Sequence, residues 1–386
     1  MHTMDTPPGP PMGIENPVER ARVIAPVVRA AADAIDQNGG LTDDVVKALS
    51  DAELFWLLVP GELGGGNGDV LQLLSVVEEI CAADVSVGWG LMVNMTVTGS
   101  CTACCDEAAL GALFENGRPI FAGSLARVGG GEIGPVDGGF RFSGRYQFAS
   151  GSAQATWVSS TAPVGDRKVS VMLPRERIEF LDNWDVLGLR GTGSRDYLIH
   201  DQVVPREFVL ESTGGAATPR RGQAVHRLGL PNVSQAAHAG VALGVGRRAF
   251  EELTVTIAAE ANRPGRTPLT DHHHFLYEAA EVEARYRAAR ALCVEVFGAA
   301  QAAAETGGAL PELLVHRMRQ ATTYTTRVAR DTVEFVYSWS GSRALRTPNA
   351  LARLLRDVHG VTQHAMVSPH SFVQVASPLL ESYGAG

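Results

Sequence analysis

Positive charge is scarce in this chain of 386 residues. Lysine and arginine together number 33 against 42 aspartates and glutamates, which gives a formal net charge of −9. General nucleic-acid binding needs a basic face, and this balance argues against it. A partner or cofactor with negative charge would have to rely on a local arginine cluster.

Cysteine is also rare. The chain has 5 cysteines, and three of them stand close together at Cys101, Cys104 and Cys105. An odd count and a cluster within an apolar segment are not typical of a disulfide framework. No second Cys/His pair has a spacing that would complete a metal site with this cluster. We therefore expect the cysteines to pack in the core as small apolar residues, and we expect no bound metal.

The sequence lacks an apolar leader and an obvious membrane span. Residues 1–14 are polar and rich in proline, which predicts a disordered leader rather than a signal peptide. Residues 85–105 carry no charge, but glycine, asparagine, serine and threonine interrupt the apolar residues. This composition favours a buried helix over a membrane helix, and we expect a cytoplasmic protein without a membrane partner.

What is present is a change of pattern at two places. Residues 15–119 and 213–386 show the apolar spacing of helices, whereas 120–212 holds short alternating runs bounded by turn signals. The pattern predicts an α+β chain with a helical N-terminal domain, a middle β-barrel or sandwich domain and a C-terminal four-helix-bundle domain. The four C-terminal helices are expected at 234–261, 271–306, 311–337 and 349–364.

Two patterns that suggest ligand binding have a simpler local explanation. Residues 129–134 fit G-x-G-x-x-G, but a β-run follows where a dinucleotide site needs a helix, so we expect a loop or hairpin. His272, His273 and His274 stand at a helix start, where consecutive side chains point in different directions. Three such imidazoles cannot share one metal ion.

Three motifs carry a resemblance to a known family. Residues 188–194 read Gly-Leu-Arg-Gly-Thr-Gly-Ser after a Trp184-Asp185 pair, and residues 144–151 read Gly-Arg-Tyr-Gln-Phe-Ala-Ser-Gly. A late Arg356-Asp357 pair lies in a predicted helix. These motifs, in an α–β–α order over nearly the whole chain, resemble the acyl-CoA dehydrogenase superfamily. The resemblance implies that superfamily's fold, with residues 188–194 beside a flavin.

The carboxylate that serves as base in dehydrogenases of this superfamily has no counterpart. No Asp or Glu occurs between Glu211 and Glu251, or between Asp357 and Glu381, the two regions where dehydrogenases place it. His364 stands in the second region instead. The chain thereby resembles the flavin-dependent monooxygenase branch, which is similar to the oxygenases of 4-hydroxyphenylacetate 3-hydroxylase and to the phenolic-steroid and dibenzothiophene monooxygenases.

The resemblance implies roles for particular residues around the flavin. Phe148 would pack on the isoalloxazine, Ser150 would face flavin N5, and Ser124 and Trp184 would also contact the cofactor. His364 would be the acid or base near the substrate, since an unperturbed histidine titrates near neutrality. The alternative for His364 is a capping or solvated histidine, with His359 facing the pocket instead. Asn94 is the polar candidate on the N-terminal helix where some relatives carry a histidine.

Two further loops resemble segments that reach the flavin of a neighbouring subunit. One contains Arg263 and Arg266, of which either is a candidate phosphate ligand, and the other contains Gly341 and Ser342. The superfamily habit of a dimer of dimers, together with the general frequency of symmetric homo-oligomers, predicts a homotetramer.

The function that the resemblance implies is that of a two-component monooxygenase. A separate flavin reductase would supply reduced FMN or FAD, which reacts with O₂ to give a C4a-hydroperoxide that oxidises a small, aromatic or related organic substrate. Two alternatives stay open: an acyl-CoA dehydrogenase or oxidase, disfavoured by the missing carboxylate, and a non-catalytic scaffold of the same fold.

Overall fold

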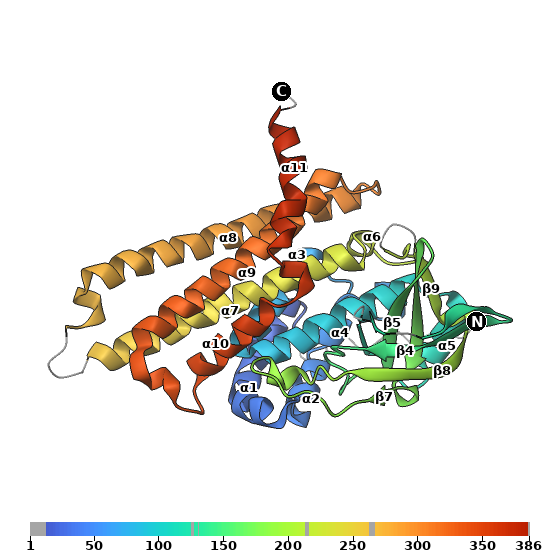
Figure 1. The fold of residues 1–386 in the computed structure, drawn as a ribbon, viewed down its shortest axis with the longest axis horizontal. Coiled ribbons are helices and arrows are strands. Elements are labelled where there is room, and N and C mark those ends of the chain that lie inside the picture. Colours follow the sequence, from blue (N-terminus) through green and yellow to red (C-terminus); the bar gives the residue numbers. More distant parts are fainter. Residues whose placement is uncertain (1–12, 125–126, 130, 213–215, 262–266, 385–386) are drawn as a thin grey trace.

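A computed structural model describes residues 13–124, 127–129, 131–212, 216–261 and 267–384. Three regions follow one another along the chain, and Figure 1 shows the two helical regions packed together with the sheets at one end. The first region is helical. Its helices are α1 (Pro17–Asn38), α2 (Asp43–Asp51), α3 (Val70–Ala83), α4 (Val85–Cys104) and α5 (Glu107–Phe114).

Two sheets form the middle region. One has the strand order β1-β5-β6-β9 and the other the order β2-β4-β8-β7, with β3 paired to β4. All pairs are antiparallel except β1 with β5. The strands span β1 (Phe121–Ser124), β2 (Arg127–Val128), β3 (Ile133–Val136), β4 (Gly139–Tyr146), β5 (Trp157–Val164), β6 (Arg167–Pro174), β7 (Glu179–Phe180), β8 (Tyr197–Pro205) and β9 (Val209–Ser212).

The third region is again helical. Helix α7 packs against α3, α4 and α9, and α8 packs against α9, so the first and third regions share one core. The sheets enclose a separate core of their own, which includes Phe142, Tyr146 and Tyr197. The helices are α6 (Ala224–Arg227), α7 (Leu230–Ala261), α8 (His273–Glu305), α9 (Glu312–Ser340), α10 (Ala350–Val361) and α11 (His370–Gly384).

Local sequence explains where several helices begin. Asp69 forms a capping box with Gln72 at the start of α3, and the Asp84 and Asp106 side chains accept backbone amides at the starts of α4 and α5. Thr42 precedes α2 at the N-cap position, but its side chain makes no capping hydrogen bond. The predicted buried helix over 85–105 corresponds to α4, whose residues are nearly all buried.

Glycine permits the close approach of helices α3, α4 and α7. A Cβ on Gly88 of α4 would lie 2.0 Å from the Cys81 sulfur, and one on Gly244 of α7 would lie 2.6 Å from the Glu78 carbonyl oxygen. No side chain fits at such distances, so α3, α4 and α7 approach one another only because these two positions are glycine.

The α–β–α order is confirmed, and two details of the C-terminal region are corrected. The helix predicted over 349–364 ends at Val361, and α11 follows it and packs on α9. Pro378 lies inside α11, which is why its sequence does not suggest a helix. The predicted leader falls mainly on residues 1–12, outside the described residues. Within the described part of the chain, no helix combines the length and apolar character needed to cross a membrane.

Candidate active site

The turn at 188–194 is held in place from the helical region. Leu189 has a φ of 57°, and its N–H donates to Oδ1 of Asp357 on α10 at 2.7 Å. A Cβ on Gly188 would lie 2.1 Å from the Arg356 carbonyl oxygen, so only glycine allows this approach. The Arg356-Asp357 pair thus anchors the turn to α10.

A second segment, 148–151, lies beside this turn. The Ala149 N–H donates to the Arg195 carbonyl at 3.0 Å and the Gly151 N–H donates to the Thr192 carbonyl at 3.3 Å. Phe148 has a φ of 63° and leaves 54% of its surface exposed. An exposed aromatic on a strained backbone is a common sign of a ligand surface.

Phe148 and Trp184 form an aromatic wall. Their ring centroids are 6.3 Å apart in an edge-to-face arrangement, and the Trp184 indole N–H donates to the Arg190 carbonyl at 3.1 Å. The neighbouring Leu187 is 72% exposed. The exposed surfaces of Phe148 and Leu187 are apolar, and an aromatic ring system can cover them.

Three hydroxyl groups line up beside this wall. Thr192 Oγ1 lies 2.6 Å from Ser194 Oγ, which lies 2.6 Å from Ser150 Oγ. The Thr192 hydroxyl also donates to the Leu189 carbonyl at 2.7 Å, and the Trp89 indole N–H donates to Ser150 Oγ at 3.1 Å. We call Thr192, Ser194 and Ser150 the hydroxyl chain. All three residues are buried.

Two histidines lie next to Trp89. The ring centroids of His238 and His364 are 4.3 Å apart, and each ring meets Trp89 edge-on, at 5.1 and 5.5 Å. Burial lowers the pKa of His364 to about 4. Burial, together with the nearby His364, also holds the pKa of His238 well below its usual value. Both imidazoles are therefore neutral at pH 7.

The tautomer of His364 follows from its backbone partner. The Met366 N–H donates to Nδ1 of His364 at 3.3 Å, so the proton of the neutral ring is on Nε2. Burial thus moves the pKa of His364 away from the near-neutral value of an unperturbed histidine. His364 accordingly offers a hydrogen-bond donor rather than a group that titrates near pH 7.

His359 and His364 point to different surroundings. Nε2 of His359 lies 3.3 Å from a carboxylate oxygen of Glu334, and 43% of the His359 side chain is exposed. His364 lies beyond the end of α10 and caps the short 3-10 turn Ala365–Val367, so helical periodicity does not relate the two residues. Of these two histidines, only His364 contacts Trp89 and His238.

Asn94 and Ser124 are tied to the backbone. The Asn94 side chain is fully buried, donates to the carbonyls of Phe121 and Gly151 at 2.9 and 3.2 Å, and accepts from Gln154 at 2.8 Å. These bonds occupy both amide hydrogens and fix the 148–151 segment to α4. The Ser124 hydroxyl donates to the Gln147 carbonyl at 2.5 Å, one residue before Phe148.

The remaining candidates are Arg263, Arg266, Gly341 and Ser342. Arg263 and Arg266 lie outside the described residues. Gly341 and Ser342 are exposed and start the 3-10 turn Gly341–Leu345. Figure 1 shows this connection between α9 and α10 at the end of the helical regions remote from the sheets.

The pKa of Asp357 reflects opposing effects of its surroundings. Burial, the largest effect, and the nearby Asp84 raise its pKa to about 7, against the opposing effects of the Leu189 N–H and Arg353. Arg353 lies 3.6 Å from Asp84, whose own pKa is raised by burial. The anchor of the 188–194 turn is therefore a carboxyl group that is costly to ionise.

This anchor predicts a pH dependence of stability. Between about pH 4 and 7, folded Asp357 retains a proton that the unfolded chain releases, so stability falls as pH rises through this window. Asp357→Asn keeps an acceptor for Leu189 and should give a flatter unfolding free energy between about pH 4 and 7. Urea unfolding at several pH values measures this. Asp185→Asn, at a site with 99% of the side chain exposed, should keep the wild-type slope. Equal slopes in wild type and Asp357→Asn would contradict the assignment.

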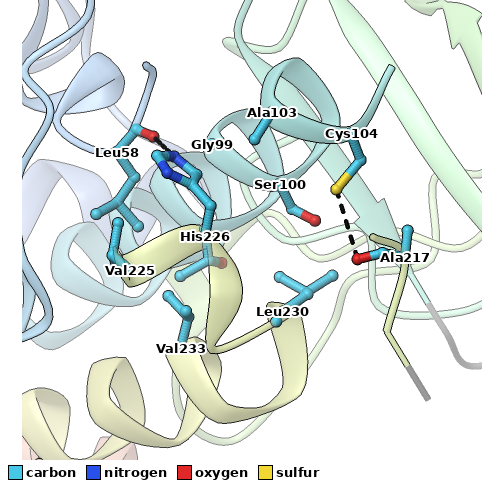
Figure 2. Close-up of a pocket in the computed structure, with 12 residues that line it drawn as sticks. Leu58, Gly99, Ser100, Ala103, Cys104, Ala217, Val225, His226, Leu230 and Val233 are labelled. Atoms are coloured by element: carbon cyan, nitrogen blue, oxygen red, sulfur yellow. Dashed lines mark hydrogen bonds between the residues drawn. The ribbon is translucent and has the colours of Figure 1, made fainter. Parts of the chain in front are cut away.

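A small cavity lies further along α4 and α7. Its lining includes Leu58, Cys104, His226, Leu230 and Val233, and among the described residues no charged side chain borders it (Figure 2). His226 donates from Nε2 to the Leu58 carbonyl at 2.7 Å, and burial lowers its pKa. The volume is about 20 Å³, room for one water molecule. An aromatic ring would not fit without movement of the lining residues.

Sequence reasoning missed four residues of the site: Trp89, Thr192, Ser194 and His238. His238 had one usable signal, because it is the only polar residue among Ala236, Ala237, Ala239 and Gly240 of a long helix. The other three belonged to motifs or helices already identified, but their mutual contacts join parts of the chain that lie far apart in the sequence.

Two family models match the chain. Residues 19–108 match the model described as "Acyl-CoA dehydrogenase, N-terminal domain", and residues 236–369 match "Acyl-CoA dehydrogenase, C-terminal domain". Among curated proteins, the chain is 28% identical to an indole-3-acetate monooxygenase of Pseudomonas putida, with 88% of this chain and 87% of the relative covered. It is 26% identical to the flavin-dependent monooxygenase oxygenase subunit HsaA of Rhodococcus jostii, with 91% and 94% covered.

Solved structures agree in fold. The 3-HSA hydroxylase from Rhodococcus sp. RHA1 has a TM-score of 0.87 at 25% identity, over 95% of this chain and 97% of that one. XiaF from Streptomyces sp., solved with FADH2 and glycerol, has a TM-score of 0.86 at 21% identity, over 95% of both chains.

Proposed function

We propose that this chain, which belongs to the acyl-CoA dehydrogenase superfamily, is the oxygenase of a flavin-dependent monooxygenase system. The observation that carries the proposal is the pair of neutral histidines, His238 and His364, packed on Trp89, whose indole N–H donates to Ser150 Oγ. Relatives over nearly the full chain length bear monooxygenase names. We infer a small aromatic substrate from the indole-3-acetate in the name of one relative.

The site argues against the dehydrogenase alternative. Removal of an α-proton from a thioester needs a free acceptor atom, and Nδ1 of His364, which lacks the proton in the neutral ring, already accepts the Met366 N–H. The carboxylate nearest to it in the sequence, Asp357, is 2% exposed and already accepts the Leu189 N–H. Neither residue can replace the missing base.

The residues present fit a flavin ring. The aromatic wall of Phe148 and half-buried Trp184 suits its apolar face, and the Ser150 hydroxyl suits the polar edge at N5. When bound, reduced FMN or FAD supplies the electrons that activate O₂ for transfer of one oxygen atom to the substrate. The chain's own tasks are to hold the ring, to keep water away, and to donate a hydrogen bond from Nε2 of His364.

Three further elements of the proposal concern partners and place. A separate reductase would supply the reduced flavin, consistent with the oxygenase-subunit name of one relative. A homotetramer would let Gly341, Ser342 and Arg263 or Arg266 reach the flavin of a neighbouring subunit. A cytoplasmic location agrees with five cysteines that are all free and buried.

A comparison of two reactions tests the function. The protein should consume an aromatic compound from a panel of indole, indole-3-acetate and simple phenols when it receives a flavin reductase, NADH, FMN or FAD, and air. Under anaerobic conditions, octanoyl-CoA should leave the bound oxidised flavin unreduced. Bleaching of the flavin by octanoyl-CoA would identify a dehydrogenase. A protein that binds neither reduced nor oxidised flavin would be a scaffold.

A further inference from the structure

The hydroxyl chain has a direction, which follows from counting hydrogens. A carbonyl oxygen only accepts, so the single hydroxyl hydrogen of Thr192 is committed to the Leu189 carbonyl, 2.7 Å away. The contact between Thr192 and Ser194, at 2.6 Å, therefore requires Ser194 to donate. The contact between Ser194 and Ser150, also at 2.6 Å, then requires Ser150 to donate.

This direction decides what Ser150 can offer a ligand. Its hydrogen is directed to Ser194, and its oxygen accepts the Trp89 indole N–H at 3.1 Å. A hydroxyl oxygen has two lone pairs, so one remains to accept from a ligand. Ser150 can act toward a bound molecule as an acceptor, but to donate it would have to break its bond to Ser194.

The first bond of the hydroxyl chain, from Thr192 to the Leu189 carbonyl, is held in place by its surroundings. The Leu189 carbonyl that accepts from Thr192 also accepts the Thr192 backbone N–H at 3.1 Å, and the Leu189 N–H is held by Asp357. Both the N–H and the carbonyl of Leu189 are thus held by hydrogen bonds. With Thr192 4% exposed and Ser194 2% exposed, water has little access to reverse the order of the bonds.

Reduced and oxidised flavin differ at the atom that Ser150 would face. N5 of reduced flavin carries a hydrogen and donates, whereas N5 of oxidised flavin has a lone pair and accepts. We propose that Thr192 and Ser194 are positioning residues that commit Ser150 to accept, so that the site selects reduced over oxidised flavin. The inference rests on the proposed function, because it requires flavin to bind beside Ser150.

The affinity ratio for the two redox states is the test. Dissociation constants for oxidised FMN and for dithionite-reduced FMN, and likewise for FAD, would be measured anaerobically by equilibrium dialysis. Wild type should favour the reduced form. Thr192→Val removes the first donor with little change in shape and frees the hydroxyls to reverse, and Ser194→Ala removes the acceptor of Ser150. Each variant should lower the preference about tenfold, the worth of one hydrogen bond.

Thr192→Ser is the matched control, because it keeps the hydroxyl and should keep the wild-type ratio. Unfolding curves show whether each variant is folded. If Thr192→Val does not fold, Ser194→Ala still tests the hydroxyl chain. The inference is overturned if wild type binds flavin but the ratio is the same in Thr192→Val and Ser194→Ala. Failure of wild type to bind either redox state would instead overturn the proposed function.

Discussion

Replacement of His364 by alanine is expected to divert reducing equivalents from product to hydrogen peroxide while flavin binding stays close to wild type. His364 carries its proton on Nε2 and packs against Trp89, and burial keeps it neutral. Positioned proton donors are worth about 10²–10⁴-fold in rate. Product and hydrogen peroxide measured together, with the reductase present, give the coupling ratio.

Two variants show whether the loss of coupling in His364→Ala comes from the missing Nε2–H donor. His359→Ala removes an imidazole that is 43% exposed and paired with Glu334, and it should change coupling little. His364→Gln retains a side-chain N–H and should recover part of the coupling. If His359→Ala uncouples the reaction and His364→Ala does not, then the site is built around the other histidine and the cluster with Trp89 and His238 has another purpose.

Ser150→Ala is expected to have the second largest effect. The variant removes the acceptor at the flavin edge, and it also leaves the Trp89 indole N–H without its partner. One lost hydrogen bond of about 1–3 kcal/mol corresponds to a roughly 5- to 150-fold increase in hydrogen peroxide relative to product.

Ser160→Ala supplies a matched control for Ser150→Ala. Ser160 is also a buried serine with a hydroxyl partner, Tyr197 at 2.7 Å, but it lies inside the sheets. The control should lower the unfolding free energy without changing coupling. Equal coupling in Ser150→Ala and wild type would remove Ser150 from the site.

Much of the fold could be predicted because its signals are local. Asp69, Asp84 and Asp106 mark helix starts through bonds to amides two or three residues away. The interrupted apolar composition of 85–105 is enough to predict a buried helix rather than a membrane span. By contrast, α11 contains Pro378, and its packing on α9 outweighs a sequence that does not favour a helix.

The candidate site was predictable only in part, because its chemistry depends on contacts across the chain. The motifs indicated Phe148, Ser150 and Trp184, and the structure brings Phe148 and Trp184 together beside Ser150. The neutral state of His364 depends on burial against α4 and α7, which no local pattern reports. The acceptor role of Ser150 depends on Thr192 and Ser194, which lie more than forty residues away in sequence.

The source of the oxygen atom in the product tests the central claim most directly. The compound consumed in the panel would be turned over with the reductase in ¹⁸O₂ and, separately, in H₂¹⁸O under air. The proposed monooxygenase predicts a product that contains one ¹⁸O atom from ¹⁸O₂ and none from H₂¹⁸O. A product without label from ¹⁸O₂ would contradict oxygen transfer at this site.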